Sequence, residues 1–176
     1  ENPTTIVNIV LGANADGLTI DSFHNGTVKK RWLDSIVDRS TNSGVRKFDL
    51  MVWQHGEADA TSMTETNYLL RFDSIKANLR NYSWFPASTP IIVCAPVPLV
   101  AGNTTQWQKD TTIQKVDYNN DDLDGYTSST GLAGSAGDEV HFTNFSLSLL
   151  SERVYNTWKS LPSRFIDRTR AISSSG

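Results

Sequence analysis

The chain has 176 residues, 38% of them hydrophobic and 20% charged, which fits one compact domain. Its 16 Lys and Arg residues against 19 Asp and Glu residues give a net charge of -3 without a run of like charges, so nucleic acid is not an expected partner. No apolar run approaches the roughly 20 residues of a membrane span or resembles the core of a signal peptide, so no membrane partner is expected either.

Short apolar runs rich in β-branched residues predict three strands buried on both faces, at 6–11, 48–53 and 91–95. Between them, apolar residues at helical spacing predict helices over 28–38 and 67–79. Strands that alternate with helices at this spacing are typical of right-handed crossovers. The sequence therefore predicts an α/β fold built on a parallel sheet.

The pattern is weaker in the second half of the chain. A last short strand is weakly indicated at 126–130, and a final helix is predicted from an N-cap at Asn144 up to Leu161. The Ser-rich tail at 163–176 is typical of a linker or a disordered end. The domain is accordingly expected to span 1–162.

The single cysteine, Cys94, lies inside the apolar run 91–95, where a buried and unreactive thiol is expected. One cysteine excludes an intramolecular disulfide framework and a cysteine-based metal cluster.

A first candidate site follows the second predicted strand directly. Residues after a buried parallel strand lie at the carboxyl edge of the sheet, where open α/β folds bind their ligands. Gly56 allows a sharp turn between His55 and Glu57. A polar loop in which Asp59 or Thr61 caps the next helix is an equally good interpretation of the composition. The polar and aromatic residues of this block are Trp53, Gln54, His55, Glu57 and Asp59.

A second candidate is the segment 137–142, which is expected to be a loop ahead of the last helix, again at the carboxyl side of the sheet. Asp138 lies three residues before His141 and can place its carboxylate on the imidazole Nδ1, which leaves Nε2 as a general base. Taken alone, this spacing fits a solvated loop before a helix better than a catalytic pair.

A third candidate, 12–20, follows the first predicted strand. Its glycines can offer a backbone N–H to an oxyanion, although a Gly-permitted turn explains them equally well. The segment lacks the glycine spacing of dinucleotide-binding loops and P-loops, so phosphate binding is not supported.

Together, the three candidates resemble the SGNH (GDSL-like) hydrolase superfamily, most closely its carbohydrate O-acetylesterase branch, which includes sialate O-acetylesterase-like enzymes and deacetylase domains of phage tail proteins. The resemblance implies a three-layer, flavodoxin-like parallel sheet flanked by helices. The matching residues are Trp53, Gly56, Glu57 and Asp59 for a W-x-Q-G-E-x-D loop, Asp138 and His141 for a late D-x-x-H block, and Gly17 for a G-x-[ST]-I segment.

The chain departs from this family at two places. His55 stands where the branch has Gln, so the side-chain donor to the oxyanion is expected to be His55, or Gln54 turned inward. The serine nucleophile, in a turn after the family's first strand, has no match. Residues 6–11 are therefore expected to be the family's second strand, and the first strand and the serine are expected upstream of Glu1, covalently joined or as a separate chain. Ser22, Ser62 and Ser146 are the alternatives inside the chain.

The resemblance implies a serine esterase that removes O-acetyl groups from a glycan or polysaccharide. His141 would be the general base and Asp138 its orienting carboxylate, while the Gly17 N–H with His55 or Gln54 would bind the oxyanion. Gly56, Glu57 and Asp59 would orient the loops that carry these residues. The alternative is an inactive carbohydrate-binding or structural module on the same fold; a lipase-like esterase is a weaker one.

The resemblance implies neither a metal nor an organic cofactor. The expected partners are the acetylated carbohydrate, the upstream segment and, by analogy with phage tail proteins, further copies of the chain. An extracellular or virion-associated location is favoured over the cytoplasm.

Overall fold

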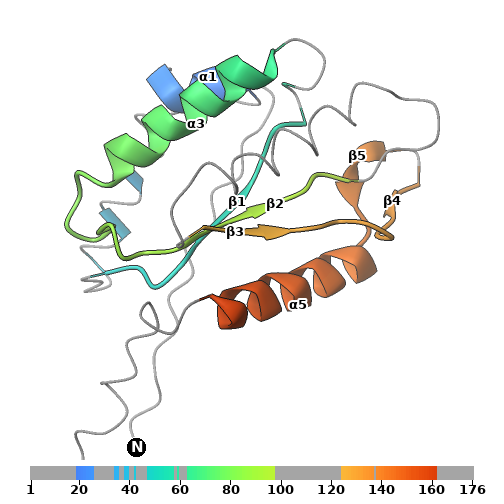
Figure 1. Ribbon diagram of the computed structural model, residues 1–176. Helices are drawn as coiled ribbons and strands as arrows, with labels where there is room; N and C mark the ends of the chain where they lie inside the picture. Colours follow the sequence, from blue (N-terminus) through green and yellow to red (C-terminus); the bar gives the residue numbers. More distant parts are fainter. Residues whose placement is uncertain are drawn as a thin grey trace, which may run out of the picture. The chain divides into compact units, whose positions relative to one another are not determined.

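The computed structural model describes residues 19–25, 34–35, 38–39, 42, 47–57, 59, 63–97, 124–136 and 138–161. The elements in chain order are α1 (Ile20–Asn25), β1 (Met51–Gln54), α3 (Glu65–Leu79), β2 (Ile91–Cys94), β3 (Asp124–Thr127), β4 (Gly134–Ser135), β5 (Asp138–Phe142) and α5 (Asn144–Ser160) (Figure 1). The described part of the chain is therefore α/β, as the sequence predicts.

The chain divides into two compact units. One, here called the helical unit, comprises residues 1–48 and 56–86 and contains α1 and α3. The other, here called the sheet unit, comprises residues 49–55 and 87–176 and contains the five described strands and α5.

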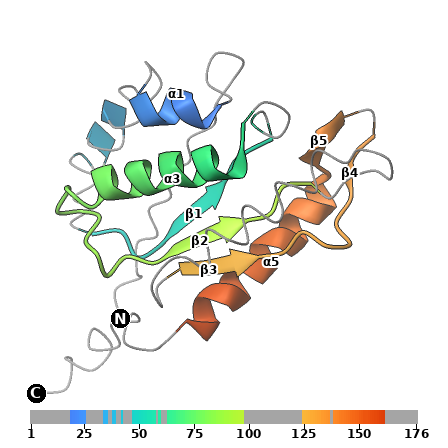
Figure 2. The ribbon, with the colours of Figure 1, turned by 45° about the horizontal axis from the view of Figure 1, so that its top comes forward.

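The core of the sheet unit is a three-stranded parallel sheet in the order β1-β2-β3 (Figure 2). Met51 of β1 pairs with Ile91 of β2, which in turn pairs with Asp124 of β3. Every residue of β2 is fully buried, as its run of apolar residues predicts. The parallel sheet expected from the alternation of strands and helices is thus present.

The predicted strand at 48–53 is wrong at its start, because β1 begins only at Met51. Phe48 belongs to the helical unit, where its N–H donates to the Trp84 carbonyl at 2.9 Å and its ring packs edge-on against the Trp84 ring. Burial of β1 on both faces is also wrong, since Val52 and Gln54 are exposed. Within the described residues β1 pairs only with β2, and Val52 and Gln54 lie on the face of β1 opposite to that of buried Trp53.

Helix α5 packs against β3 and β2 along its length (Figure 1). The contact is close at Gly125, where an added Cβ would lie 2.7 Å from Thr157 Cγ2. The N-cap is Thr143 rather than the predicted Asn144, because Thr143 has extended backbone angles and its hydroxyl accepts a hydrogen bond from the Ser146 N–H at 3.1 Å.

The segment 137–142 is not the loop that the sequence predicts. From Asp138 onward it forms β5, which pairs with β4 in an antiparallel and irregular ladder (Figure 1). The ladder pairs Gly134 with Phe142 and Ser135 with Asp138, and the Phe142 carbonyl also accepts the Ser135 hydroxyl at 3.1 Å. Polar and apolar residues alternate over 139–142, which is the period of a strand.

In the helical unit, α3 confirms the helix predicted at 67–79 and begins two residues earlier, after an N-cap at Thr64. Its buried face carries Tyr68, Phe72, Ile75 and Leu79. Helix α1, which no sequence pattern predicts, packs against α3. Of the predicted helix 28–38, the structure describes residues 34, 35 and 38, which are helical.

Several predictions fall on residues outside the described ranges. These are the strand at 6–11, the tail at 163–176 and most of the helix at 28–38. The strand predicted at 126–130 is right only at residues 126 and 127, because β3 runs from Asp124 to Thr127 and residues 128–130 lie beyond its end. No helix among the described residues combines the length and the apolar character that crossing a membrane requires.

Cys94 is fully buried at the end of β2, as the sequence predicts. Burial raises the pKa of its thiol from 9.0 to about 12, because the thiolate would lose its hydration. The thiol therefore stays protonated and unreactive near neutral pH.

Candidate functional site

Two histidines lie at the carboxyl edge of the sheet unit. Because the three strands are parallel, their carboxyl ends meet at one edge, and His55 follows the last residue of β1 there. Strand β5, which carries His141, is held at the same edge by Phe142. The apolar cluster that includes Phe142 is formed with Cys94, Val97, Leu132 and Leu150. This edge is where parallel α/β sheets bind their ligands.

The two candidate side-chain donors to the oxyanion, His55 and Gln54, differ in their exposure to water. Trp53 and His55 are nearly buried, with 6% and 9% of their surfaces exposed, and their ring centroids lie 5.1 Å apart. Gln54 between them is exposed, as the alternation of a strand requires. A donor in a water-poor environment stabilises a developing charge more strongly than one in water, so this geometry favours His55 over Gln54.

His141 is exposed, and the backbone on both sides of it is fixed. Its neighbour Phe142 pairs with Gly134 of β4, and the Thr143 N–H donates to the Ala133 carbonyl at 3.1 Å. Thr143 also caps α5. An imidazole on such a segment is accessible to a substrate while its backbone is held in place, which is the situation that a general base requires.

Asp138 begins β5, and its backbone pairs with Ser135. Its side chain is outside the described part of the structure, and so is the side chain of Ser22. Gly17 and Ser62 lie outside it entirely. The pairing of the Asp138 carboxylate with His141 and the backbone donor at Gly17 therefore stay predictions.

Ser146 has a structural role in the first turn of α5. It is 2% exposed, and its hydroxyl oxygen accepts hydrogen bonds from the Ala133 N–H at 2.8 Å and from the Thr143 hydroxyl at 3.0 Å. The first contact ties α5 to the residue before β4, and the second lies within the N-cap of α5. A hydroxyl that is enclosed in this way is poorly placed to attack an ester.

In the helical unit, Gly56 makes the sharp turn that the sequence predicts. Its φ is +122°, and an added Cβ would lie 3.2 Å from the Tyr68 hydroxyl. The turn continues through half-buried Glu57 to Asp59, whose N–H donates to the Gly56 carbonyl at 3.1 Å. Position 56 therefore requires glycine both for its backbone angle and for the close approach of Tyr68.

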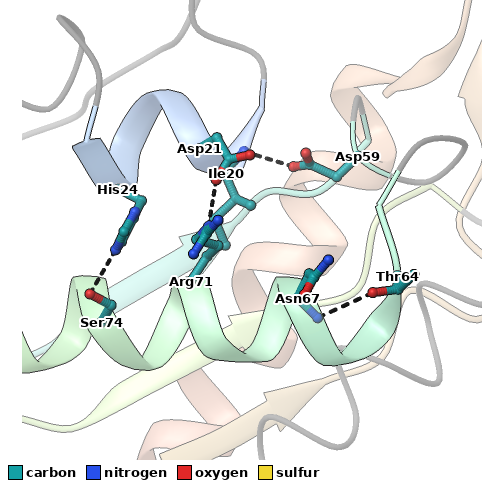
Figure 3. A network of polar contacts seen from close by, with 8 residues as sticks. All are labelled: Ile20, Asp21, His24, Asp59, Thr64, Asn67, Arg71 and Ser74. Atoms are coloured by element: carbon teal, nitrogen blue, oxygen red, sulfur yellow. Dashed lines mark hydrogen bonds and ion pairs between the residues drawn. The ribbon is translucent and has the colours of Figure 1, made fainter.

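Asp59 does not cap the helix that follows it, since that N-cap is Thr64. Its carboxylate is 2% exposed and accepts the N–H of Ile20, the first residue of α1, at 2.8 Å (Figure 3). The predicted cap of the following helix is therefore wrong for Asp59, which instead accepts an N–H from a helix 39 positions away in the sequence, and Thr61 lies outside the described residues. Asp59 holds the start of α1, close in sequence to Gly17.

Sequence reasoning missed two further contacts on α1. The Arg71 guanidinium of α3 donates to the Asp21 carboxylate at 2.6 Å, and His24 Nε2 lies 2.8 Å from the Ser74 hydroxyl (Figure 3). Each pair joins residues 50 positions apart, so no local pattern could have indicated them.

Among the described residues, no group of three or more His, Cys, Asp or Glu side chains is arranged to hold a metal ion. A comparison with models of protein families matches none of them to this chain, and a comparison with curated proteins finds no significant match either.

Proposed function

We propose that the chain forms the larger part of a serine esterase that removes O-acetyl groups from a glycan or polysaccharide. The observation that carries the proposal is the position of His55 and His141 at the same carboxyl edge of one parallel sheet. The resemblance of the Trp53–Asp59 and Asp138–His141 segments to the O-acetylesterase branch of SGNH hydrolases supports it.

In the proposed reaction, a serine hydroxyl attacks the acetyl carbonyl while His141 accepts its proton. A bond forms between the serine oxygen and the acetyl carbon, and the tetrahedral oxyanion accepts a hydrogen bond from His55; a second donor, the Gly17 N–H, is implied by the family resemblance alone. When the bond to the sugar oxygen breaks, His141 donates the proton to that oxygen. Water then releases acetate from the acyl-enzyme by the same steps, with Asp138 orienting the imidazole throughout.

We further propose that the serine comes from a segment that precedes this sequence. Of the alternatives, Ser146 has its hydroxyl engaged in the α5 cap. Ser22 and Ser62 remain the competing candidates, and the family's G-x-S turn has no match in the chain. The nucleophile is thus the part of the site for which an experiment is most informative.

The test uses the natural full-length polypeptide that contains this sequence. We expect a fluorophosphonate probe to label one serine, located by mass spectrometry of the digested protein, and we expect acetate release from an acetylated glycan. A label on the preceding segment supports the proposed origin of the serine, and a label on Ser22 or Ser62 contradicts it. If no serine is labelled and no acetate is released, a carbohydrate-binding or structural module becomes the better description.

A variant with His141→Ala isolates the general base. We expect acetate release to fall by about 10³-fold or more while the fold is retained, because the imidazole is exposed and contributes little packing. The matched control is Asn144→Ala, which changes an exposed polar residue three positions away and is expected to leave turnover unchanged. Equal activity in the two variants would rule out His141 as the base.

A further inference from the structure

The first turn of α5 reverses the usual placement of polar and apolar side chains. Ser146 is buried, whereas its neighbour Phe145 is 74% exposed, more than any other large apolar side chain that the structure describes. The hydrophobic effect favours the opposite arrangement, with the phenyl ring inside and the hydroxyl in water. Other contacts must therefore fix the rotation of this turn.

The hydrogen bonds of Ser146 fix that rotation. Its hydroxyl oxygen accepts from the Ala133 N–H at 2.8 Å and from the Thr143 hydroxyl at 3.0 Å. Consecutive residues of a helix point about 100° apart, so a rotation of α5 that buried Phe145 would carry Ser146 away from Ala133. The Ala133 N–H would then lose its acceptor. The fold thus keeps the Phe145 ring in water.

Phe145 and His141 share one fixed segment at the carboxyl edge of the sheet unit. Between them, Phe142 belongs to the buried apolar cluster, and the Thr143 N–H donates to the Ala133 carbonyl at 3.1 Å. The four residues from His141 to Phe145 span at most about 14 Å. Figures 1 and 2 show the N-terminal end of α5 beside β5, which carries His141. An exposed aromatic ring therefore accompanies the exposed imidazole.

A second exposed ring, Tyr155, lies near the other end of α5 and differs in its surroundings. It is 52% exposed, its ring centroid lies 6.0 Å from that of Trp158, and the Lys159 ammonium lies 5.3 Å from the ring. Within the described part of the chain, Phe145 has no such ring or cation partner. The Phe145 ring is therefore the one that is available to a ligand near His141.

We propose that Phe145 stacks against a sugar ring of the acetylated glycan and thereby selects carbohydrate esters over simple acetate esters. The face of an aromatic ring is electron-rich and attracts C–H groups, which a sugar ring presents on its own faces. The sugar would lie on Phe145 while its acetyl group reaches His141. This inference rests on the proposed esterase function and adds a residue that binds the carbohydrate rather than the ester.

The kinetic test compares Phe145→Ala, Phe145→Tyr and Tyr155→Ala in the full-length polypeptide. The substrates are phenyl acetate, which has no sugar, and partially O-acetylated gluco-, manno-, xylo- and sialo-oligosaccharides, of which the one that the unsubstituted protein deacetylates fastest is used.

Phe145→Ala should raise KM for the oligosaccharide about tenfold with kcat nearly unchanged, because stacking stabilises the ground state and the transition state alike. Hydrolysis of phenyl acetate should stay the same, since no sugar is present to stack. Phe145→Tyr keeps the ring and should restore KM. Tyr155→Ala removes a comparably exposed ring from the same helix and should change neither parameter.

Two further measurements are independent of turnover. Calorimetric titration of the His141→Ala variant with the same oligosaccharide gives its affinity, which the additional change Phe145→Ala should weaken about tenfold. The thermal unfolding midpoint should not fall in Phe145→Ala, because the ring is mostly exposed and contributes little packing.

The outcomes separate this inference from the proposed function. Unchanged KM and affinity in Phe145→Ala overturn the stacking role, and so does an equal loss of activity toward phenyl acetate. A dimer that dissociates on Phe145→Ala would overturn it as well and assign the ring to a contact between copies. Absence of acetate release from every oligosaccharide overturns the proposed function. Titration of the unsubstituted protein with the same oligosaccharides then decides the stacking role: binding that depends on Phe145 supports it, and absence of binding overturns it.

Discussion

The sheet unit and the helical unit hold their candidate site residues by different means. In the sheet unit, β2 is buried along its whole length and an apolar cluster attaches β5 to the carboxyl edge. In the helical unit, α1 buries Ile20 and Phe23 and is also held by polar contacts: the Asp59 carboxylate accepts its first N–H, and Arg71 and Ser74 contact two of its side chains. Apolar burial supplies most of the stability of a fold, whereas directional contacts supply exact position at a smaller energetic gain. Substitutions in the two units should therefore differ in what they disturb.

The largest loss of stability is expected in the sheet unit. Ile92→Ala should lower the free energy of unfolding by about 2–5 kcal/mol, because it leaves a cavity beside a fully buried strand. Val52→Ala is the matched control, since Val52 pairs with Ile92 on the neighbouring strand but is 47% exposed, and its loss should be much smaller. Urea titration measures both, and equal losses would mean that the burial of β2 does not govern stability.

In the helical unit, Gly56→Ala should cost about 1–3 kcal/mol, because its backbone angle disfavours any side chain and a Cβ would crowd the Tyr68 hydroxyl at 3.2 Å. Gly131→Ala serves as the control. Gly131 also has a positive φ, of +78°, but an added Cβ there would have no neighbour within 4 Å. The difference between the two thermal unfolding midpoints therefore measures the contact with Tyr68 together with the less accessible backbone angle at Gly56, and a larger loss at Gly131 would contradict both.

The dependence of stability on pH should carry a contribution from Cys94. Its pKa is raised by burial from 9.0 to about 12, so the unfolded chain loses the thiol proton first as the pH rises. Stability is therefore retained below pH 9 and falls between pH 9 and about 12, with a loss of about 2 kcal/mol between pH 8 and pH 10.5. Urea titrations at these two pH values should show this loss, and Cys94→Ala should lack that part of it.

The smallest effect is expected at the Asp21–Arg71 pair. Because both side chains are 40% or more exposed, a double-mutant cycle with Asp21→Asn and Arg71→Gln should give a coupling of under about 1 kcal/mol, which added salt reduces further. A coupling of several kcal/mol would show that the contacts of α1 rival the apolar contacts of the sheet, and would remove the contrast between the two units.

The same contrast explains which parts of the fold were predictable from sequence. Strand β2 and helices α3 and α5 are recognisable because apolar residues recur with the period of each element and each is buried on a matching face. Helix α1 is too short for such a pattern: it buries only Ile20 and Phe23, and its polar partners lie 39 and 50 positions away. Strand β5 differs from the predicted loop because the glycine and acidic residues at its start are typical of loops, although polar and apolar residues alternate over 139–142 as in a strand.

For the candidate site, the sequence predicted the edge of the sheet on which His55 and His141 lie, because that follows from strand order in a parallel sheet. It could not choose between His55 and Gln54, since this depends on which face of β1 is covered. It also could not assign Asp59 a partner. Contacts between distant polar residues depend on tertiary geometry, to which local periodicity is insensitive.

The parallel register of β1, β2 and β3 has a consequence for the rate at which the protein reaches its native state. Met51 meets Ile91, and Ile91 meets Asp124, only after long stretches of chain have closed into loops. Closing those loops costs conformational entropy before the contacts between the strands provide any stabilisation. Strand pairing rather than helix formation should therefore limit the folding rate. During that delay the four apolar residues of β2 are exposed, and pairing with another chain competes with completing the sheet.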